Sequence, residues 1–452
     1  MKAILTDTAL RAARYLDSLR SRSNIPSQAA VDALAHLNEP LPVHPTEPDQ
    51  VLATLDEIGS PATVNMAGPR FFGFVIGGAL PATVAANWMA TAWDQSSSLY
   101  NVTPGVAYIE QVAMDWLIDL LGFPEACGGA LVTGATVANF SALAAARNKV
   151  LRHDGWDVEA DGLFGAPPIT VITGEEVHPS VLKALGMLGL GRNRIVRVPA
   201  DNQGRMRADQ LPALKGPTII CSQAGNVNTG AFDPVGEICD QAHSSNAWVH
   251  VDAAFGLWVA GVPSLQHLCP GLADADSWAT DGHKMLNVPY DCGVALVKDP
   301  DALRRAMAIT AEYLPTDSEQ RNPADYTPEL SRRARGVEVW AALKSLGRSG
   351  VIDMVERMCR HAGLFAEKLS EAGFTVLNDV VYNQLLVSFG TPQQTLQVID
   401  AVQAEGTCWA GGTVWQGHTA MRISTCNWAT TDEDVLASVE AIKRCASDVL
   451  QP

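Results

Sequence analysis

Several features that would assign a function directly are missing from this chain. None of its nine cysteines forms a Cys-x-x-Cys pair or joins a Cys/His cluster with zinc-ligand spacing. The sequence contains no G-x-x-x-x-G-K-[ST] phosphate loop and no G-x-S-x-G nucleophile elbow. These absences exclude a zinc module, a P-loop nucleotidase and a serine hydrolase of the elbow type, and they favour reduced, mostly buried thiols.

Positive charge and long apolar runs are also scarce. The chain has 32 Lys and Arg against 49 Asp and Glu, a formal net charge of -17, which repels phosphodiester backbones and anionic lipid surfaces. Within residues 1–20, Asp7 interrupts any apolar run, so we expect neither a signal peptide nor a spanning helix. The expected protein is cytoplasmic, with no nucleic-acid partner and no membrane partner.

What the sequence does contain is enough apolar material for a large core. The chain has 452 residues, 47% of them hydrophobic, which predicts two or three domains. From about 115 to 300, short β-branched or apolar runs such as GALVTG, ITVITG and PTIICSQ alternate with helical patterns. That alternation predicts an α/β fold with a mainly parallel central sheet and helices on both faces.

Composition changes suggest where the domains divide. A Pro-rich stretch from Pro40 to Pro48 follows a helical opening. After residue 305 come a proline-rich loop, a long helix around 335–346, and short strands near 380–389 and 420–425. We therefore expect an N-terminal helical segment over 1–60, a large domain over 61–310, and a loop with a smaller C-terminal α+β domain over 311–452.

Polar residues that directly follow an apolar run are the candidates for a site, because open α/β sheets bind ligands at the carboxyl ends of their strands. In LVTGATVAN, a strand leads through Gly134, Ala135 and Thr136 into a helix beginning near Val137. Backbone N–H groups at a helix start suit a phosphate. Simple capping of the helix by Thr136 is the alternative.

Two further segments place an ionisable group at the end of a strand. AWVHVDAAFG delivers Asp252, whose carboxylate can pair with a protonated ring nitrogen or cap the following helix. VITGEEVHPSVLKALG puts His178 at a helix start, where an imidazole can stack on a flat ring or act as a structural cap. His250 and Asp252 stand two apart without a third ligand nearby, which argues against a metal pair.

The last segment is ADSWATDGHKMLNVP, which we interpret as a polar loop containing Ser277, His283 and Lys284. A lysine amine becomes nucleophilic when it is desolvated or placed beside other cations. An ordinary surface lysine is the alternative.

In this order the segments resemble the group II pyridoxal 5'-phosphate (PLP) dependent amino-acid decarboxylases, the family of aromatic-L-amino-acid and glutamate decarboxylases. The resemblance runs from about Phe71 to Thr431, and HVDAAFG with DSWATDGHKMLNVPYDCG are its most specific parts. It implies the aspartate-aminotransferase-like PLP fold (fold type I), PLP as the cofactor, no metal, and decarboxylation of an L-amino acid to the amine and carbon dioxide.

The resemblance also implies roles for individual residues. Lys284 would hold the cofactor as a Schiff base, and Asp252 would stabilise the protonated pyridine nitrogen. His178 would stack over the ring near the substrate carboxylate, and Ala254 would pack beneath it. The phosphate would be held by Ala135, Thr136 and His283.

Other positions match the family's pattern only in part. Asn226 stands where the family usually has a threonine that contacts the ring, Val137 replaces an acidic residue, and Met285 replaces a tryptophan. The segment containing Phe74 and Val75 resembles the family's substrate segment but lacks the pattern of the aromatic decarboxylases.

Two residues outside the large domain have roles implied by the resemblance. Tyr313 would return a proton to the α-carbon from a mobile loop, or it is an ordinary exposed tyrosine. Arg422 would meet a substrate carboxylate, or it makes a structural ion pair.

Fold and cofactor do not fix the reaction. The alternatives are a carbon–carbon lyase, an aldehyde synthase, an aminotransferase, and a catalytically silent PLP-binding partner protein. The resemblance further implies a homodimer with active sites at the interface, to which residues around Asp94 to Pro104 contribute.

Overall fold

The computed structural model describes residues 1–309 and 320–450, which form two compact units. The larger unit comprises Ala79–Ala362 and Asn378–Leu385, and the other comprises Met1–Gly78, Gly363–Leu377 and Leu386–Pro452. The expected division of the chain into domains at residues 60 and 310 stays a prediction.

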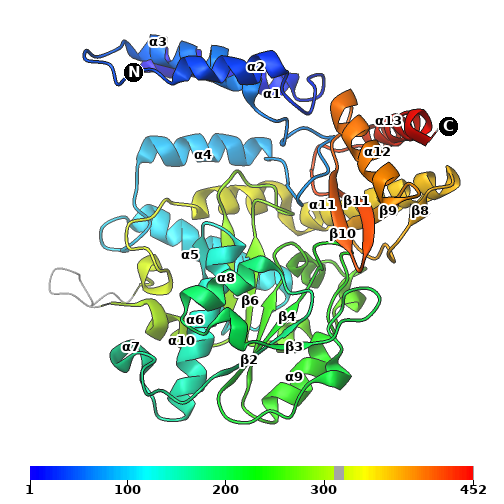
Figure 1. The fold of residues 1–452 in the computed structure, drawn as a ribbon. Coiled ribbons are helices and arrows are strands. Elements are labelled where there is room, and N and C mark those ends of the chain that lie inside the picture. The colour runs from blue at the N-terminus through cyan, green and yellow to red at the C-terminus, as the bar shows by residue number, and fades with distance from the viewer. Residues whose placement is uncertain (310–319, 451–452) are drawn as a thin grey trace. The chain divides into compact units, whose positions relative to one another are not determined.

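A seven-stranded sheet forms the centre of the larger unit (Figure 1). Its spatial order is β1-β7-β6-β5-β4-β2-β3. β2, β3, β4, β5 and β6 pair in parallel, and β7 runs antiparallel to both of its neighbours, so the expected mainly parallel sheet is confirmed. The strands are β1 (Gly128–Val132), β2 (Thr170–Gly174), β3 (Val196–Val198), β4 (Thr218–Gln223), β5 (Trp248–Asp252), β6 (Ser277–Asp281) and β7 (Gly293–Val297).

One helix organises the packing of this sheet. α6 (Ala135–His153) contacts β1, β4, β5, β6 and β7, and it also packs against α8 and α10. Small side chains allow this close approach: Ala138, Ala142 and Ala145 are completely buried on α6. The other helices of the unit are α4 (Pro81–Trp93), α5 (Pro104–Leu121), α7 (Val158–Asp161), α8 (Pro179–Met187), α9 (Val235–His243), α10 (Pro300–Met307) and the first part of α11 (Gly336–Glu371).

α11 is much longer than the helix expected over 335–346. It continues to Glu371, and Gly347 interrupts it with φ 60° and ψ 179°. A positive φ is accessible to glycine at little cost, so the chain bends there and resumes a helix. The sequence pattern stopped at this glycine because a glycine after a helical run usually marks an end.

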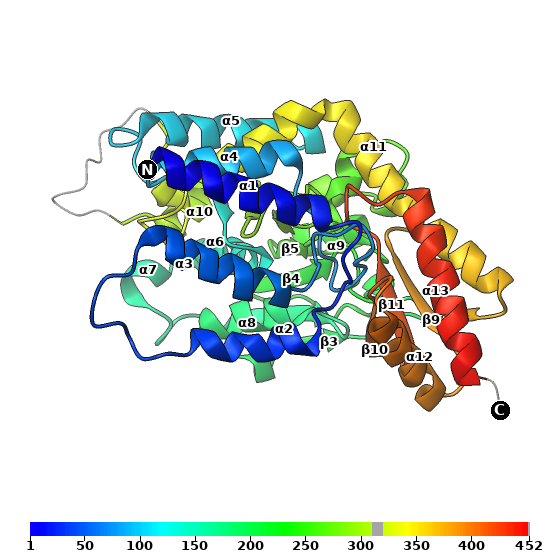
Figure 2. The same ribbon diagram turned by 90° about the horizontal axis from the view of Figure 1, so that it is seen from above.

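The other unit carries the N-terminal helices and a small sheet. α1 (Lys2–Ser18) and α3 (Pro48–Thr54) pack side by side, as Figure 2 shows, with α2 (Gln28–Ala33) nearby in the sequence. The sheet has the order β10-β11-β9-β8, which confirms the expected smaller α+β part. Its elements are β8 (Thr375–Val376), β9 (Gln384–Ser388), β10 (Gly411–Trp415), β11 (His418–Ser424), α12 (Pro392–Glu405) and α13 (Asp432–Leu450).

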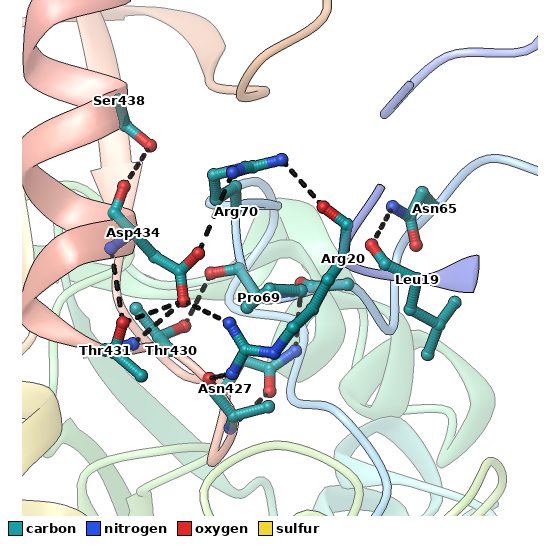
Figure 3. A network of polar contacts seen from close by, with 12 residues as sticks. Leu19, Arg20, Asn65, Pro69, Arg70, Asn427, Thr430, Thr431, Asp434 and Ser438 are labelled. Atoms are coloured by element: carbon teal, nitrogen blue, oxygen red, sulfur yellow. Dashed lines mark hydrogen bonds and ion pairs between the residues drawn. The ribbon is translucent and has the colours of Figure 1, made fainter. Parts of the chain in front are cut away.

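A polar network joins the N-terminal segment to the start of α13 within this unit (Figure 3). Asp434, whose side chain is 7% exposed, lies 3.0 Å from Arg20 Nη1 and 3.8 Å from Arg70 Nη1. The same carboxylate accepts hydrogen bonds from the N–H and the hydroxyl of Thr431, both at 3.1 Å. Asp434 therefore caps α13 and pairs with two cations from distant parts of the sequence.

We expect Asp434→Asn to lower the free energy of unfolding of this unit by about 2 kcal/mol, because a nearly buried carboxylate with charged partners is lost. Urea unfolding followed by circular dichroism measures the change. Glu440→Gln is the control, since Glu440 forms an exposed pair with Lys443 and should change stability by less than about 0.5 kcal/mol. Equal effects of the two variants would contradict this role for Asp434.

Candidate functional site

Neighbouring parallel strands bring Asp252 and Lys284 to the same edge of the larger sheet. β5 is buried throughout and ends at Asp252, as expected. β6 pairs with it in parallel and ends at Asp281, three residues before Lys284. The expectation that this whole segment is a loop was wrong, because Ser277–Asp281 form a completely buried strand. Lys284 lies in the turn that follows that strand.

Asp281 is a site residue that the sequence analysis missed. Its Oδ2 lies 2.8 Å from Lys284 Nζ, and its Oδ1 accepts a 2.6 Å hydrogen bond from the N–H of Ala135. The Lys284 side chain is 18% exposed and that of Asp281 only 4%. The only sequence signal for Asp281 was its position three residues before Lys284. From sequence alone, an aspartate at the end of a strand cannot be distinguished from one that caps a helix.

The imidazole of His283 is oriented by three contacts. Its ring stacks on that of Tyr290 at 4.2 Å, and its Nδ1 accepts a 3.2 Å hydrogen bond from the N–H of Cys292. Its Nε2 lies 3.6 Å from Asp281 Oδ1. Burial lowers the pKa of His283, which keeps the ring neutral, and the contact at Nδ1 puts the proton on Nε2. His283 therefore offers an N–H donor beside the start of α6.

The start of α6 fits an anion. The helix begins at Ala135, two residues earlier than expected, with Gly134 as its N-cap residue and no side-chain cap. Capping by Thr136 is therefore wrong. A Cβ added at Gly134 would lie 3.4 Å from both Asp281 Oδ1 and His283 Cε1, an ordinary van der Waals distance, so the glycine is not required there by space. The N–H groups at the helix start are what suit an anion.

His178 lies at the N-cap of α8 and is linked to Asp252 by one serine. Its Nδ1 accepts the N–H of Ser180 at 3.2 Å and lies 2.8 Å from the Ser180 hydroxyl. That hydroxyl is 3.2 Å from Asp252 Oδ2. The capping alternative is therefore confirmed, and the same geometry ties His178 to the carboxylate expected at the ring nitrogen.

Asp252 is itself held in place. Its side chain is 3% exposed, and its Oδ1 accepts a 3.3 Å hydrogen bond from the N–H of Ala254. The carbonyl of Ala254 accepts the N–H of Asp281 at 2.9 Å, which connects the two ends of the site. Asp252 does not cap the next helical turn, whose N-cap residue is Gly256.

Asn226 is engaged elsewhere. Its amide donates to Glu176 Oε2 at 2.9 Å, and its Oδ1 accepts the N–H groups of Asn228 at 2.8 Å and Thr229 at 3.2 Å. These contacts shape the turn after β4. A direct contact of Asn226 with the cofactor stays a prediction.

The remaining predicted residues belong to the other unit or lie outside the described residues. Phe74 is 61% exposed and its ring stacks on Trp409 at 5.3 Å, while Val75 is buried. Both have positive φ values, 55° and 56°, a strained backbone that persists only where the surroundings hold it. Arg422 lies on β11, where burial lowers its pKa. Tyr313 lies outside the described residues.

A fully buried histidine lies behind the site. His250 on β5 is 0% exposed, and burial lowers its pKa to about 3, well below its ordinary value of 6.5. Between these values the unfolded chain binds a proton that the folded protein does not. This contribution to stability is complete above pH 6.5 and is lost as the pH falls.

Between about pH 3 and pH 6.5 we expect the free energy of unfolding of His250→Gln to fall less steeply with decreasing pH than that of wild type. The difference in slope is up to about 1.4 kcal/mol per pH unit, the value for one proton taken up on unfolding. Urea midpoints at pH 7 and pH 5 measure it. The exposed His153 provides the control, and His153→Gln should leave the pH dependence unchanged. An identical slope in wild type and His250→Gln would contradict a neutral buried His250.

Comparison with known proteins gives consistent results. The family model described as the pyridoxal-dependent decarboxylase conserved domain matches residues 31–390. The acidic amino acid decarboxylase of Bos taurus is 30% identical over 334 residues, covering 71% of this chain and 63% of that protein. The match thus spans less than two thirds of the bovine protein. The aromatic-L-amino-acid decarboxylase of Bacillus atrophaeus is 26% identical over 441 residues, covering 91% and 88%.

The fold is shared with a solved structure. The crystal structure of Oryza sativa TDC with PLP and tryptamine superposes with a TM-score of 0.92 at 22% identity, covering 100% of this chain and 98% of that one. This likeness confirms the expected PLP fold. Over residues 1–309 and 320–450, no helix has the length and apolar character needed to span a membrane.

Proposed function

We propose, since this chain belongs to the pyridoxal-dependent decarboxylase family, that it removes the α-carboxylate of an L-amino acid as carbon dioxide and releases the amine. Family membership confirms PLP as the cofactor. The observation that carries the proposal is the convergence of Lys284, Asp252 and His178 at one edge of the larger sheet, joined by the short hydrogen-bonded links through Asp281, Ala254 and Ser180.

The residues present fit this cofactor. Lys284 supplies the amine that binds the aldehyde, and the buried Asp252 supplies a carboxylate for a protonated ring nitrogen. Backbone N–H of Ala135 and the Nε2–H of His283 suit the phosphate. Asp281 Oδ1 already accepts the hydrogen bond of the Ala135 N–H, so a phosphate that uses this N–H must displace that oxygen.

When bound, PLP accepts the electron pair left on the α-carbon as carbon dioxide departs. Asp252 keeps a proton on the ring nitrogen, which makes the ring a better electron acceptor. His178 would pack over the ring and direct the substrate carboxylate. Lys284 would hold the cofactor through its amine. Ala254 would pack under the ring, Thr136 and Asn226 would contact the cofactor, and Tyr313 would return the proton to the α-carbon.

We assign Phe74 and Val75 to the substrate side chain and Arg422 to a substrate carboxylate. Two observations support this: an exposed aromatic ring on a strained turn is a common feature of binding segments, and a half-buried arginine suits a carboxylate.

A panel of L-amino acids tests the proposed reaction, with carbon dioxide and amine measured together. It should contain acidic and aromatic substrates, because the two relatives are named for these. Equal amounts of carbon dioxide and amine are expected. Aldehyde, keto acid or cleaved products would instead indicate an aldehyde synthase, an aminotransferase or a carbon–carbon lyase, and bound PLP without turnover would indicate a silent partner protein.

The assembly we propose is a homodimer located in the cytoplasm, with Asp94 to Pro104 reaching the partner's site. α1, α2 and α3 contain no buried side chain and expose Leu5, Leu10 and Val51, an apolar surface that a second copy would cover. Light scattering should give twice the chain mass, and Leu5→Glu with Leu10→Glu should favour the monomer. A monomer that binds PLP and turns over would refute the dimer.

A further inference from the structure

A chain of buried hydrogen bonds runs through the larger unit to Asp252. Trp248 Nε1 donates to Ser277 Oγ at 2.8 Å, and Ser277 Oγ lies 2.9 Å from His250 Nδ1. His250 Nε2 lies 2.8 Å from Asn139 Oδ1. The chain thus joins two adjacent strands to α6 beneath the site.

The direction of every bond in this chain follows from its members. Burial keeps His250 neutral, so it carries one N–H. Asn139 Oδ1 can only accept, which puts that N–H on Nε2 and makes Nδ1 the acceptor for the Ser277 hydroxyl. Asn139 Nδ2 then donates to Ser180 Oγ at 3.3 Å. All donors therefore point toward the site, an arrangement in which each bond polarises the next.

Ser180 is where the chain reaches two functional groups. Its single hydroxyl proton faces two acceptors, Asp252 Oδ2 at 3.2 Å and His178 Nδ1 at 2.8 Å. If the proton goes to Asp252, the short contact with His178 requires an N–H on Nδ1, but that nitrogen already accepts the N–H of Ser180 at 3.2 Å. If it goes to His178, Asp252 loses a donor. The state of one group therefore determines the hydrogen bonding of the other.

We propose that Ser180 is a positioning residue that gives its hydroxyl proton to His178 Nδ1 and thereby holds the proton of His178 on Nε2. Two observations favour this arrangement: Nδ1 already accepts the N–H of Ser180 at 3.2 Å, and the hydroxyl lies closer to Nδ1 than to Asp252. The inference rests on the cofactor contacts of the proposed function. It adds that Asn139 and His250 act on the site through Ser180 without touching cofactor or substrate.

The test compares Ser180→Ala with Ser180→Thr, which keeps the hydroxyl. We expect Ser180→Ala to weaken PLP binding about tenfold, the upper range for losing one hydrogen bond that orients the ring of His178. In the loaded protein labelled with ¹⁵N-histidine, the His178 nitrogen signals should show Nε2 protonated in wild type and Ser180→Thr, and the Nδ1 signal should shift in Ser180→Ala.

Two further variants separate this role from a structural one. Ser141 is also buried on α6, but its hydroxyl has no hydrogen-bond partner within the described residues, so Ser141→Ala should leave PLP affinity and the His178 signals unchanged. Asn139→Ala removes the donor to Ser180 and should weaken PLP binding about threefold, a fraction of the effect at Ser180 itself. It also serves as the test if Ser180→Ala does not fold.

The outcomes are distinguishable. Unchanged PLP affinity and unchanged His178 signals in Ser180→Ala and Asn139→Ala would overturn the inference while the proposed function stands. Wild-type protein that binds no PLP would overturn the proposed function itself. Equal losses in Ser180→Ala and Ser141→Ala would show a packing effect and would also overturn the positioning role.

Discussion

Lys284→Ala will form no covalent bond to PLP and will lose turnover by on the order of 10⁴-fold or more, the size of effect seen when the group carrying covalent catalysis is removed. Lys284 Nζ, 2.8 Å from Asp281 and 5.9 Å from the ring centre of Phe255, lies in the described site beside the start of α6. The visible spectrum before and after borohydride measures the bond, and carbon dioxide release measures turnover.

Two control variants identify the cause of this loss. Lys284→Arg keeps the charge that pairs with Asp281 but cannot form the bond, so it should retain the folding stability of wild type and still lose the reducible band. Lys183→Ala changes an exposed lysine on α8 and should behave as wild type. A reducible band that survives in Lys284→Ala would place the cofactor on another lysine and would refute the assignment.

Gly293→Ala should be nearly as damaging, although Gly293 makes no contact through a side chain. A Cβ at this position would lie 2.5 Å from both Cα and C of Gly134, closer than real Cβ atoms approach. The obstacle is backbone, so the start of α6 must move. We expect the free energy of unfolding to fall by about 3 kcal/mol, the upper range for overpacking. We also expect PLP binding to weaken on the order of a hundredfold, because the phosphate donors shift.

Gly105→Ala provides the matched control. A Cβ at Gly105 would meet no atom within 4 Å, and this residue lies at the start of helix α5. Its PLP affinity should match wild type, as measured by fluorescence titration. If Gly293→Ala binds PLP as tightly as Gly105→Ala, the close contact between β7 and α6 has no part in holding the phosphate.

The larger sheet was predictable wherever a strand is apolar. β4 and β5 are buried parallel strands built around apolar residues, TIICSQ and WVHVD, and such segments show in the sequence. β6 was taken for a loop because Ser277, Thr280 and Asp281 are polar. Each of these is buried with a partner from another element: Ser277 binds Trp248 and Thr280 binds the carbonyl of Ala254. Those partners exist only once the sheet has formed.

The site was predictable where its residues follow a strand directly, as Asp252 does. Asp281 and Ser180 were missed although they stand three residues from Lys284 and two from His178. Their importance comes from hydrogen bonds across 146 residues to Ala135 and 72 residues to Asp252, and no local pattern carries that information. The roles of all the predicted site residues, including Lys284, Asp252 and His178, remain predictions.

The antiparallel strand β7 also determines when the nascent chain can complete its larger sheet. β1 pairs with β7, and Gly128 faces Val297 across 169 positions of the chain. A ribosome that adds about 5–20 residues per second needs roughly 10–30 s after β1 to synthesise β7, the strand with which β1 pairs. During that interval the edge of β1 is unpaired and open to other strands, and the close contact between Gly293 and Gly134 does not exist. The cofactor can meet a finished phosphate site only after synthesis has passed β7.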